Sequence, residues 1–445
     1  MTNRMKTSAV VLLSTLALGA CDGLLDVKNP NNLVEESIEQ VSAASAVVNG
    51  AQARTARAIS YIWQPYLVAS DDFYWIGSRD AWLSLDQGFL SDPNNEFTDA
   101  AFPPLGDARW MADRAVGILE GHVAQTPSAK MKTELARANM YAGLIHMIIG
   151  EVQEDFAFSD KTKDGPPVGP DQMFTVLDKS IAYLDKAVSG FQEVGNADMQ
   201  LRATAIRARA KHSRAIWGQI NPSPKAGNGV VGAAGAAADA LAAIGMAGGV
   251  ASDWRYDLHY SAGTVGNDMA SWINSRKENQ VDLSLVSLNS SKDVESIKIK
   301  DPITNGEDPA FKKRLEHFRN GPFNSKGDTY APLTVVSARL LHLILAEDAL
   351  SKGDNPGFTT HINHVRAMDG LTPYSGQIPA VDMLRHTRRV NTFAMGLRLA
   401  DMYRFGVKDT RWLAGGEARD KPGTMLPITI IELRSNCYLN NTCSG

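Results

Sequence analysis

Two Arg- and Ala-rich segments recur along the chain at a fixed distance, and this repeat constrains the fold more than any other feature. Segments 130–150 and 201–218 align at an offset of 68 residues when Gly218 is placed on Gly150. Between them, segment 173–193 carries an apolar stripe at helical spacing. The offset is twice the tetratricopeptide period of about 34 residues, although the full tetratricopeptide consensus is absent. We therefore expect helix pairs that stack through small residues.

Other segments extend this helical pattern. Helices are expected from near Glu35 to Ile59, from Arg109 to Thr126, and over 335–352, 359–368 and 381–405. The Gly- and Ala-biased segment 226–249 is either low-complexity chain or, over 233–244, a further helix. The sequence therefore predicts an all-α protein with a tetratricopeptide-like helical repeat scaffold.

Composition divides residues 35–445 into a helical frame and a loop-rich cap within a single domain. We assign the frame to 35–60, 109–250 and 333–406, where the helical pattern is strong. Residues 61–108 and 251–332 are irregular, the latter with polar runs and several prolines, and are expected to form a loop-rich capping subdomain. Residues 407–445 are expected to be coil.

The N-terminal residues have the features of a bacterial lipoprotein signal. Arg4 and Lys6 precede a short apolar run that ends in Leu18-Gly19-Ala20-Cys21. The run is too short to span a bilayer. We expect residues 1–20 to be a cleaved signal peptide and Cys21 to carry lipid that anchors the protein, with 21–34 as an extended tether. An ordinary secretory peptide with an incidental cysteine is the alternative.

The net charge argues against one class of partner, and the cysteines predict one disulfide. The formal net charge is −4, which argues against a nucleic-acid partner. Apart from Cys21, the chain contains only Cys437 and Cys443. We expect these two to close a small loop as a disulfide, with two free thiols or half a metal site as alternatives.

A search for catalytic and metal-binding motifs finds none. The chain lacks a nucleotide-cradling loop, a nucleophile elbow, a His-Glu-x-x-His motif and a calcium-loop spacing of acids. His361 and His364 are spaced to face one metal from a helix, but no acidic or cysteine ligand is near them in sequence, so packing or exposed histidines are favoured. We predict no catalytic residue, no metal and no cofactor.

Aromatic residues crowd into two stretches, around 61–82 and 254–272. Sugar rings stack on indole and phenol rings, while nearby polar groups bind their hydroxyls. Packing in the core is the alternative for most of these rings. Trp75, Trp82, Trp254 and Trp272 lie in loop-like contexts and are expected at the surface. The ligand-binding candidates are Tyr74, Trp75, Trp82, Trp254, Tyr256 and Trp272, with Asp71, Asp72, Arg79 and Asn267 as polar neighbours.

Blocks along nearly the whole chain resemble the SusD/RagB family of outer-membrane lipoproteins. Each block is weak singly, but they occur in the family's order. The blocks are the leader from Cys21 to Pro30, Arg109-Trp110, Arg137–Gly150, Leu343-Ile344-Leu345-Ala346-Glu347, Ile362-Asn363-His364-Val365-Arg366-Ala367, the segment from Gly396 to Gly406 with Arg398, Asp401 and Arg404, and Leu426-Pro427-Ile428 with Glu432.

This resemblance implies a SusD-like fold and a non-enzymatic function. The family captures a glycan or other nutrient for a partner SusC-like TonB-dependent transporter. The resemblance thus implies a lipid-anchored protein of the outer membrane, facing the cell surface, and leaves the ligand open between glycan, peptide and other nutrients. The alternative is a lipid-anchored tetratricopeptide scaffold that binds protein partners in the periplasm. A glycan hydrolase is a third, less favoured reading.

Overall fold

The computed structural model of the protein describes residues 38–160 and 163–443. The chain divides into two compact units, Met1–Ala46 and Val47–Gly445, and the second unit is described here by itself. The predicted signal peptide, the lipid-attachment residue Cys21 and the tether lie outside the described residues. No helix in the described ranges is both long enough and apolar enough to cross a bilayer.

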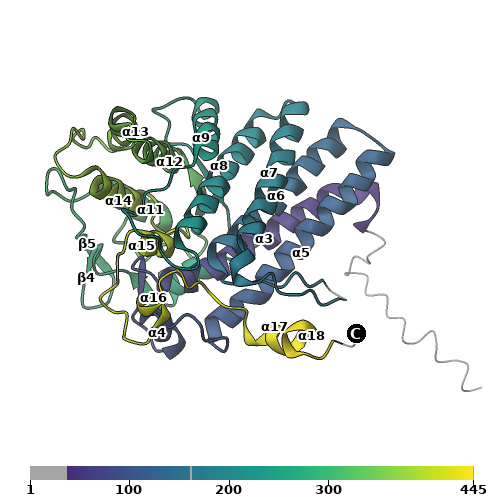
Figure 1. The fold of residues 1–445 in the computed structure, drawn as a ribbon, viewed down its shortest axis with the longest axis horizontal. Coiled ribbons are helices and arrows are strands. Elements are labelled where there is room, and N and C mark those ends of the chain that lie inside the picture. Colours follow the sequence, from purple (N-terminus) through teal and green to yellow (C-terminus); the bar gives the residue numbers. More distant parts are fainter. Residues whose placement is uncertain (1–37, 161–162, 444–445) are drawn as a thin grey trace, which may run out of the picture. The chain divides into compact units, whose positions relative to one another are not determined.

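Long antiparallel helices form one half of the second unit. Helices α5 to α9 follow one another in chain order, each packed against the next (Figure 1). Their bounds are α5 Glu96–Gln125, α6 Ala129–Val152, α7 Phe174–Glu193, α8 Ala197–Ile220 and α9 Ala234–Met246, and α3 spans Ala44–Val68. Helix α9 shows that the Ala-dense centre of the segment 226–249 is helical.

The predicted repeat is present in the structure. Helices α6 and α8 have the same length, 24 residues, and start 68 residues apart. Each begins at an equivalent cap, because the Ser128 and Asn196 side chains each accept a hydrogen bond of 3.2 Å from a backbone N–H three residues on. Gly143 and Gly150 of α6 leave room for Leu184 and Leu177 of α7, which a Cβ at either glycine would displace. Small residues therefore allow the helices to pack closely.

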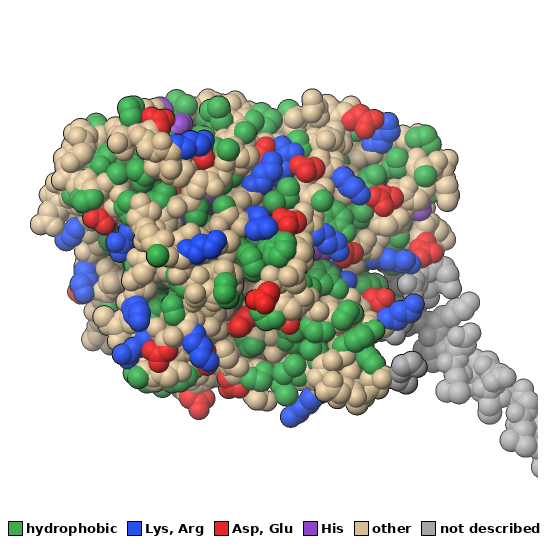
Figure 2. Space-filling model, in the orientation of Figure 1, with side chains coloured by type: hydrophobic (Ala, Val, Ile, Leu, Met, Phe, Trp, Pro, Cys, Tyr) green, Lys and Arg blue, Asp and Glu red, His purple; other side chains and the backbone are tan. Residues whose placement is uncertain are grey.

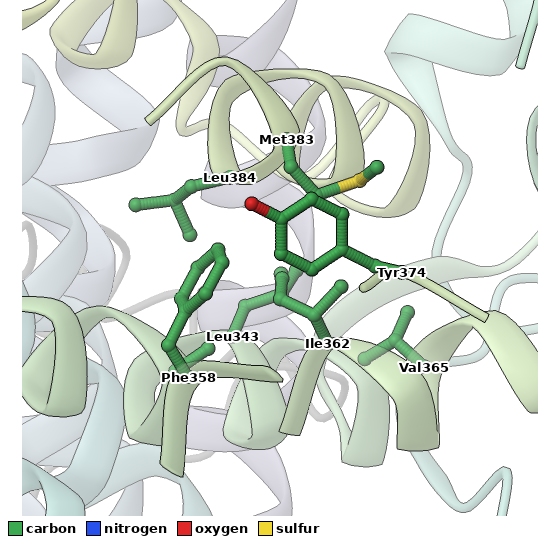
Figure 3. Packing of buried hydrophobic residues seen from close by; sticks show 8 residues of the cluster. Leu343, Phe358, Ile362, Val365, Tyr374, Met383 and Leu384 are labelled. Atoms are coloured by element: carbon green, nitrogen blue, oxygen red, sulfur yellow. The ribbon is translucent and has the colours of Figure 1, made fainter. Parts of the chain in front are cut away.

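Shorter helices form the other half of the unit. They are α11 Pro309–Arg319, α12 Ala338–Ser351, α13 Asn355–Ala367, α14 Ala380–Asn391 and α15 Arg398–Arg404. A buried cluster joins α12, α13 and α14 (Figure 3). In it, Leu343 of α12 lies beside Ile362 of α13, and Met383 and Leu384 of α14 pack on the other side of the cluster, so one core joins the three helices.

Among the described residues, strands form three two-stranded antiparallel sheets. The pairs are β1 Phe73–Trp75 with β3 Asn279–Val281, β2 Arg255–Leu258 with β6 Leu333–Ser337, and β4 Val286–Leu288 with β5 Val294–Ile297. In the second pair Arg255 lies opposite Ser337, which places the segment after residue 254 beside the start of α12. Strand pairing thus joins residues 255–258 to residues 333–337.

The expected loop-rich character of 61–108 is wrong. Helix α3 continues to Val68 and includes Pro65, α4 spans Asp80–Asp86, and α5 starts at Glu96 although it contains Pro103 and Pro104. Burial of Phe97, Phe102 and Leu105 against the core stabilises the helix where proline alone would interrupt it.

The C-terminal segment 407–445, expected to be coil, contains three short helices in its described part. They are α16 Glu417–Asp420, α17 Ile430–Ser435 and α18 Cys437–Asn440. Cys437 and Cys443 are joined by a disulfide across α18. Segments of four to six residues carry too few turns for a helical periodicity to be visible in the sequence.

Candidate ligand-binding groove

A surface groove runs along one side of α3. It consists of two adjoining hollows, with volumes of about 710 Å³ and about 500 Å³, which share the lining residues Ala53, Thr264 and Val265. The opposite wall comes from the segment 254–271, with Thr329 and Tyr330 beside it. We call these two hollows together the α3 groove. Each has the size of a small-molecule binding site.

The larger hollow combines aromatic rings with charged groups. Arg57 lies over the ring of Tyr61, with its guanidinium carbon 5.4 Å from the ring centroid. Arg54, one helical turn before, forms an ion pair with Asp107. Tyr330 is 38% exposed, so its ring is accessible to a ligand. The hollow therefore offers ring faces and hydrogen-bond donors on the same surface.

Asp268 adds an acidic group to this hollow. Burial raises its pKa to about 6, against the opposing effects of a hydrogen bond from Trp272 and of the charges of Arg276 and Arg57. The Trp272 Nε1–H donates to Asp268 Oδ2 at 3.0 Å and orients the carboxyl group. Near neutral pH this group accepts hydrogen bonds, and near pH 6 it also donates them.

The smaller hollow holds two of the predicted ligand-binding residues. Trp254 and Tyr256 line it together with Arg202 and His259. Trp254 is half-buried, whereas Tyr256 is 5% exposed and lies beneath Arg202, whose guanidinium carbon is 5.4 Å from the ring centroid. Trp254 thus offers a partly open ring, and Tyr256 mainly supports the floor.

Asn267 lines the larger hollow, but its side chain is already engaged in the protein. Its oxygen accepts a hydrogen bond from the Ala270 backbone N–H at 3.0 Å, and its nitrogen donates to the Ala331 carbonyl at 2.7 Å. Asn267 therefore caps the short helix α10 Asp268–Ala270 and fixes Asp268 in the groove.

The expectation that Trp82 and Trp272 lie at the surface is wrong. Trp82 belongs to α4 and is 1% exposed; its ring stacks on Phe97 with a centroid distance of 3.7 Å. Trp272 is 9% exposed and meets Trp82 edge to face at 5.9 Å. Arg79 covers Trp272 at 5.6 Å and pairs with Glu96. Rings that pack on one another are removed from water. Trp82, Phe97 and Trp272 are therefore part of the core.

Asp71 and Asp72 have structural roles, because their carboxyl groups bind other parts of the chain. Asp71 forms ion pairs with Arg389 and Arg398; burial opposes ionisation, but the charges of these two arginines hold the pKa of Asp71 well below its usual range. Asp72 is 1% exposed, and its Oδ2 accepts a hydrogen bond from the Ala394 backbone N–H at 3.1 Å. The surroundings of this pair therefore do not support its interpretation as a ligand contact.

Tyr74 and Trp75 lie on β1, and neither lines the α3 groove. Both are half-buried. Arg411 lies over the Tyr74 ring at 5.6 Å, and burial raises the pKa of Tyr74 to about 12. The structure thus brings Trp254, Tyr256 and Asn267 to one groove and leaves the other candidates elsewhere.

Comparisons with known proteins give matches only at the level of structure. No family model and no curated protein matches the chain. A SusD superfamily protein from Bacteroides thetaiotaomicron VPI-5482 matches with a TM-score of 0.63 and 13% identity, covering 89% of this chain and 98% of that chain. The fold is SusD-like. A SusD superfamily protein from Bacteroides vulgatus ATCC 8482 (TM-score 0.59) and a laminarin-binding SusD-like protein (TM-score 0.56) also match, each at 13% identity over 89% of this chain and 97% of the other.

The SusD-like fold confirms the fold class expected from the sequence blocks. In this fold Glu347, Asp401 and Arg404 of the resembling blocks form a buried ionic network, which Arg388 joins. Arg388 and Arg404 both donate to Asp401, at 2.9 Å and 2.8 Å, and Arg404 also pairs with Glu347. Glu347 further accepts a hydrogen bond from the Val231 backbone N–H at 3.0 Å. These residues therefore connect α12, α14 and α15, and their role is structural.

Sequence reasoning missed several residues of the groove in this SusD-like chain. Arg54, Arg57 and Tyr61 follow one another at helical spacing on α3, so a polar stripe on an otherwise apolar helix was the available signal. Tyr330 and Arg202 carry no such signal. Tyr330 stands alone in the sequence, Arg202 is one of several arginines in segment 201–218, and both reach the groove only through the tertiary fold.

Proposed function

We propose that this SusD-like protein binds a glycan in the α3 groove. The observation that carries the proposal is the groove itself, where the rings of Tyr61, Tyr330 and Trp254 lie among Arg54, Arg57 and Asp268. Rings bind the apolar faces of sugars, and charged groups bind their hydroxyls. A structural neighbour described as laminarin-binding supports a glucan as the first ligand to test.

The proposal extends to location and partner. The Leu18-Gly19-Ala20-Cys21 signal supports a lipid on Cys21 that anchors the protein in the outer membrane. We infer that the protein faces the cell surface and delivers its ligand to a SusC-like TonB-dependent transporter. No catalytic step is part of this function, because a binding protein needs only to hold and release its ligand.

Binding measurements on groove variants test the ligand proposal. A panel of soluble glycans that includes laminarin is titrated against the purified protein by calorimetry. Tyr330→Ala and Trp254→Ala are each expected to weaken binding about tenfold, which is the loss of one stacked ring. Tyr438→Ala, an exposed ring outside the groove, is the matched control and is expected to bind as the unmodified protein does.

Two outcomes contradict the proposal. Binding that is unchanged in both groove variants places the ligand elsewhere. Failure to bind any glycan, together with copurification of periplasmic proteins and no TonB-dependent transporter, favours the tetratricopeptide-scaffold alternative instead.

A further inference from the structure

Three histidines from two helices meet at one place outside the α3 groove. His342 lies on α12, and His361 and His364 lie on α13. Their ring centroids are 5.0 Å (His342–His364), 5.6 Å (His342–His361) and 6.0 Å (His361–His364) apart. The sequence placed only His361 and His364 on a common helix; the third ring comes from a helix that precedes them in the chain.

The buried cluster of Figure 3 explains why the rings meet. Each histidine immediately precedes a core residue, namely Leu343, Ile362 or Val365. Because these three apolar side chains pack together, the neighbouring positions on the two helices are brought together as well (Figure 3). The positions of the histidine backbones are therefore fixed by the core.

The hydrogen bonds of His342 set its tautomer. Its Nε2 lies 3.2 Å from the Val250 carbonyl oxygen, which only accepts hydrogen bonds, so Nε2 carries the proton. The lone pair is then on Nδ1, which lies 3.3 Å from Nδ1 of His361. A backbone carbonyl that holds the far nitrogen of an imidazole is the arrangement that orients histidine ligands in metal sites.

One nitrogen–nitrogen distance in the cluster, between His342 and His361, already matches a shared metal ion. With metal–nitrogen bonds of about 2.0–2.1 Å and a tetrahedral angle, two ligand nitrogens lie about 3.4 Å apart, close to the separation of the two Nδ1 atoms. We propose that His342, His361 and His364 form a binding site for a divalent transition metal, with Zn²⁺ as the best match and water as a fourth ligand. Imidazole ligands favour Zn²⁺, Cu²⁺ and Ni²⁺ over the harder Mg²⁺ and Ca²⁺.

Metal binding requires two small adjustments. His361 moves its proton from Nδ1 to Nε2, so that its Nδ1 binds the metal. His364 turns its half-buried ring to bring a nitrogen toward the other two, since no nitrogen of His364 lies within 4.8 Å of both partners' ligand atoms.

A second group of residues of metal-ligand type does not need an ion to explain it. Among the described residues, Asp301, Asp308 and His386 have ligand atoms within 4.8 Å of one another. Arg366 donates to Asp301 at 2.8 Å, and Asp308 caps α11 through the Ala310 N–H at 2.8 Å. Because these carboxylates already have protein partners, their grouping is explained without an ion.

Zinc titration of the full mature chain, prepared without a histidine tag, tests the proposal. Calorimetry and elemental analysis after dialysis are expected to give one Zn²⁺ per chain, and Zn²⁺ is expected to raise the melting temperature. His361→Gln and His364→Gln are each expected to weaken binding at least tenfold. His386→Gln, in the Asp301–Asp308 set, is the matched control and is expected to retain full affinity.

Cobalt provides a readout of the coordination itself. Co²⁺ bound at the histidine cluster is expected to give the intense visible absorption of tetrahedral coordination, and His364→Gln is expected to remove it. The proposal is overturned by a protein that binds no Zn²⁺, by binding that His361→Gln and His364→Gln leave unchanged, or by binding that is lost in His386→Gln. It does not depend on the glycan proposal, because the cluster lies outside the α3 groove.

Discussion

At the scale of single residues, burial determines which polar side chains hold the protein together. Asp72 illustrates this, because its carboxyl group is 1% exposed and only Oδ2 has a hydrogen-bond partner among the described residues. Burial raises the pKa of Asp72 to about 7, although the charges of Arg389 and Arg398 oppose this. A carboxyl group of this kind makes stability depend on pH.

The sign of that dependence follows from proton uptake. Between about pH 4 and pH 7 the unfolded chain loses the Asp72 proton while the folded protein keeps it, so this group's contribution to stability falls as pH rises. Asp72→Asn cannot ionise. The free energy of unfolding of the variant, measured by urea denaturation, is therefore expected to increase relative to the unmodified protein from pH 5 to pH 8. A difference that stays constant over this range contradicts the raised pKa.

The burial of single side chains also shows what the sequence alone does not predict. Trp254 and Trp272 both lie in irregular sequence contexts, and both were expected at the surface. Trp272 instead packs against Trp82 and Phe97, which are far from it in the chain, whereas Trp254 stays half-buried at the groove. Local sequence does not distinguish these cases, because the partners that bury a ring are brought together only by the tertiary fold.

At the scale of helices and strands, local pattern predicts much more. Helices α6, α7 and α8 were expected within a few residues of their bounds, because α7 carries a long apolar stripe and α6 and α8 are long Arg- and Ala-rich repeats. The start of α5 was missed, because a helix was expected only from Arg109, whereas buried aromatic side chains extend it back through Pro104 and Pro103 to Glu96. The α3 groove could not be predicted from the sequence, because its walls come from segments about 200 residues apart.

The network around Glu347 tests how elements are connected. Glu347 is fully buried; it pairs with Arg404 and lies 3.1 Å from His212 Nε2, so it links α12 to α15 and α8. Glu347→Gln removes one of the two carboxylates that pair with the buried Arg404 and leaves Asp401 as the other. We expect a loss of about 3–5 kcal/mol in the free energy of unfolding, measured by chemical denaturation.

An exposed ion pair is the control for this change. Arg214 and Asp178 pair at 2.9 Å at the surface, with side chains 33% and 51% exposed. Asp178→Asn is expected to change the free energy of unfolding by less than about 1 kcal/mol. Equal effects of the two substitutions would show that the buried network contributes no more than a surface pair.

At the scale of the whole molecule, the proposed ligand-binding groove and the proposed lipid anchor belong to different parts of the chain. All residues that line the α3 groove lie in the unit Val47–Gly445, whereas the proposed lipid-attachment residue, Cys21, precedes that unit. On the face shown in Figure 2, Lys and Arg side chains are interspersed with Asp and Glu side chains, so that face has no patch of a single charge for binding a membrane surface.

This separation leads to a prediction about the unanchored protein. Exchange of residues 1–20 for an ordinary cleavable secretory signal, combined with Cys21→Ser, is expected to move the protein from the membrane fraction to the soluble fraction. Its glycan affinity, measured by calorimetry, is expected to stay within about twofold of the unmodified protein, since the groove is unchanged. The variant Cys437→Ser/Cys443→Ser, which keeps the native signal and Cys21, is expected to remain in the membrane fraction. If the unanchored protein stays with the membrane, a second attachment exists and the lipid is not the sole anchor; if it leaves the membrane but loses the glycan, the groove requires residues before Val47.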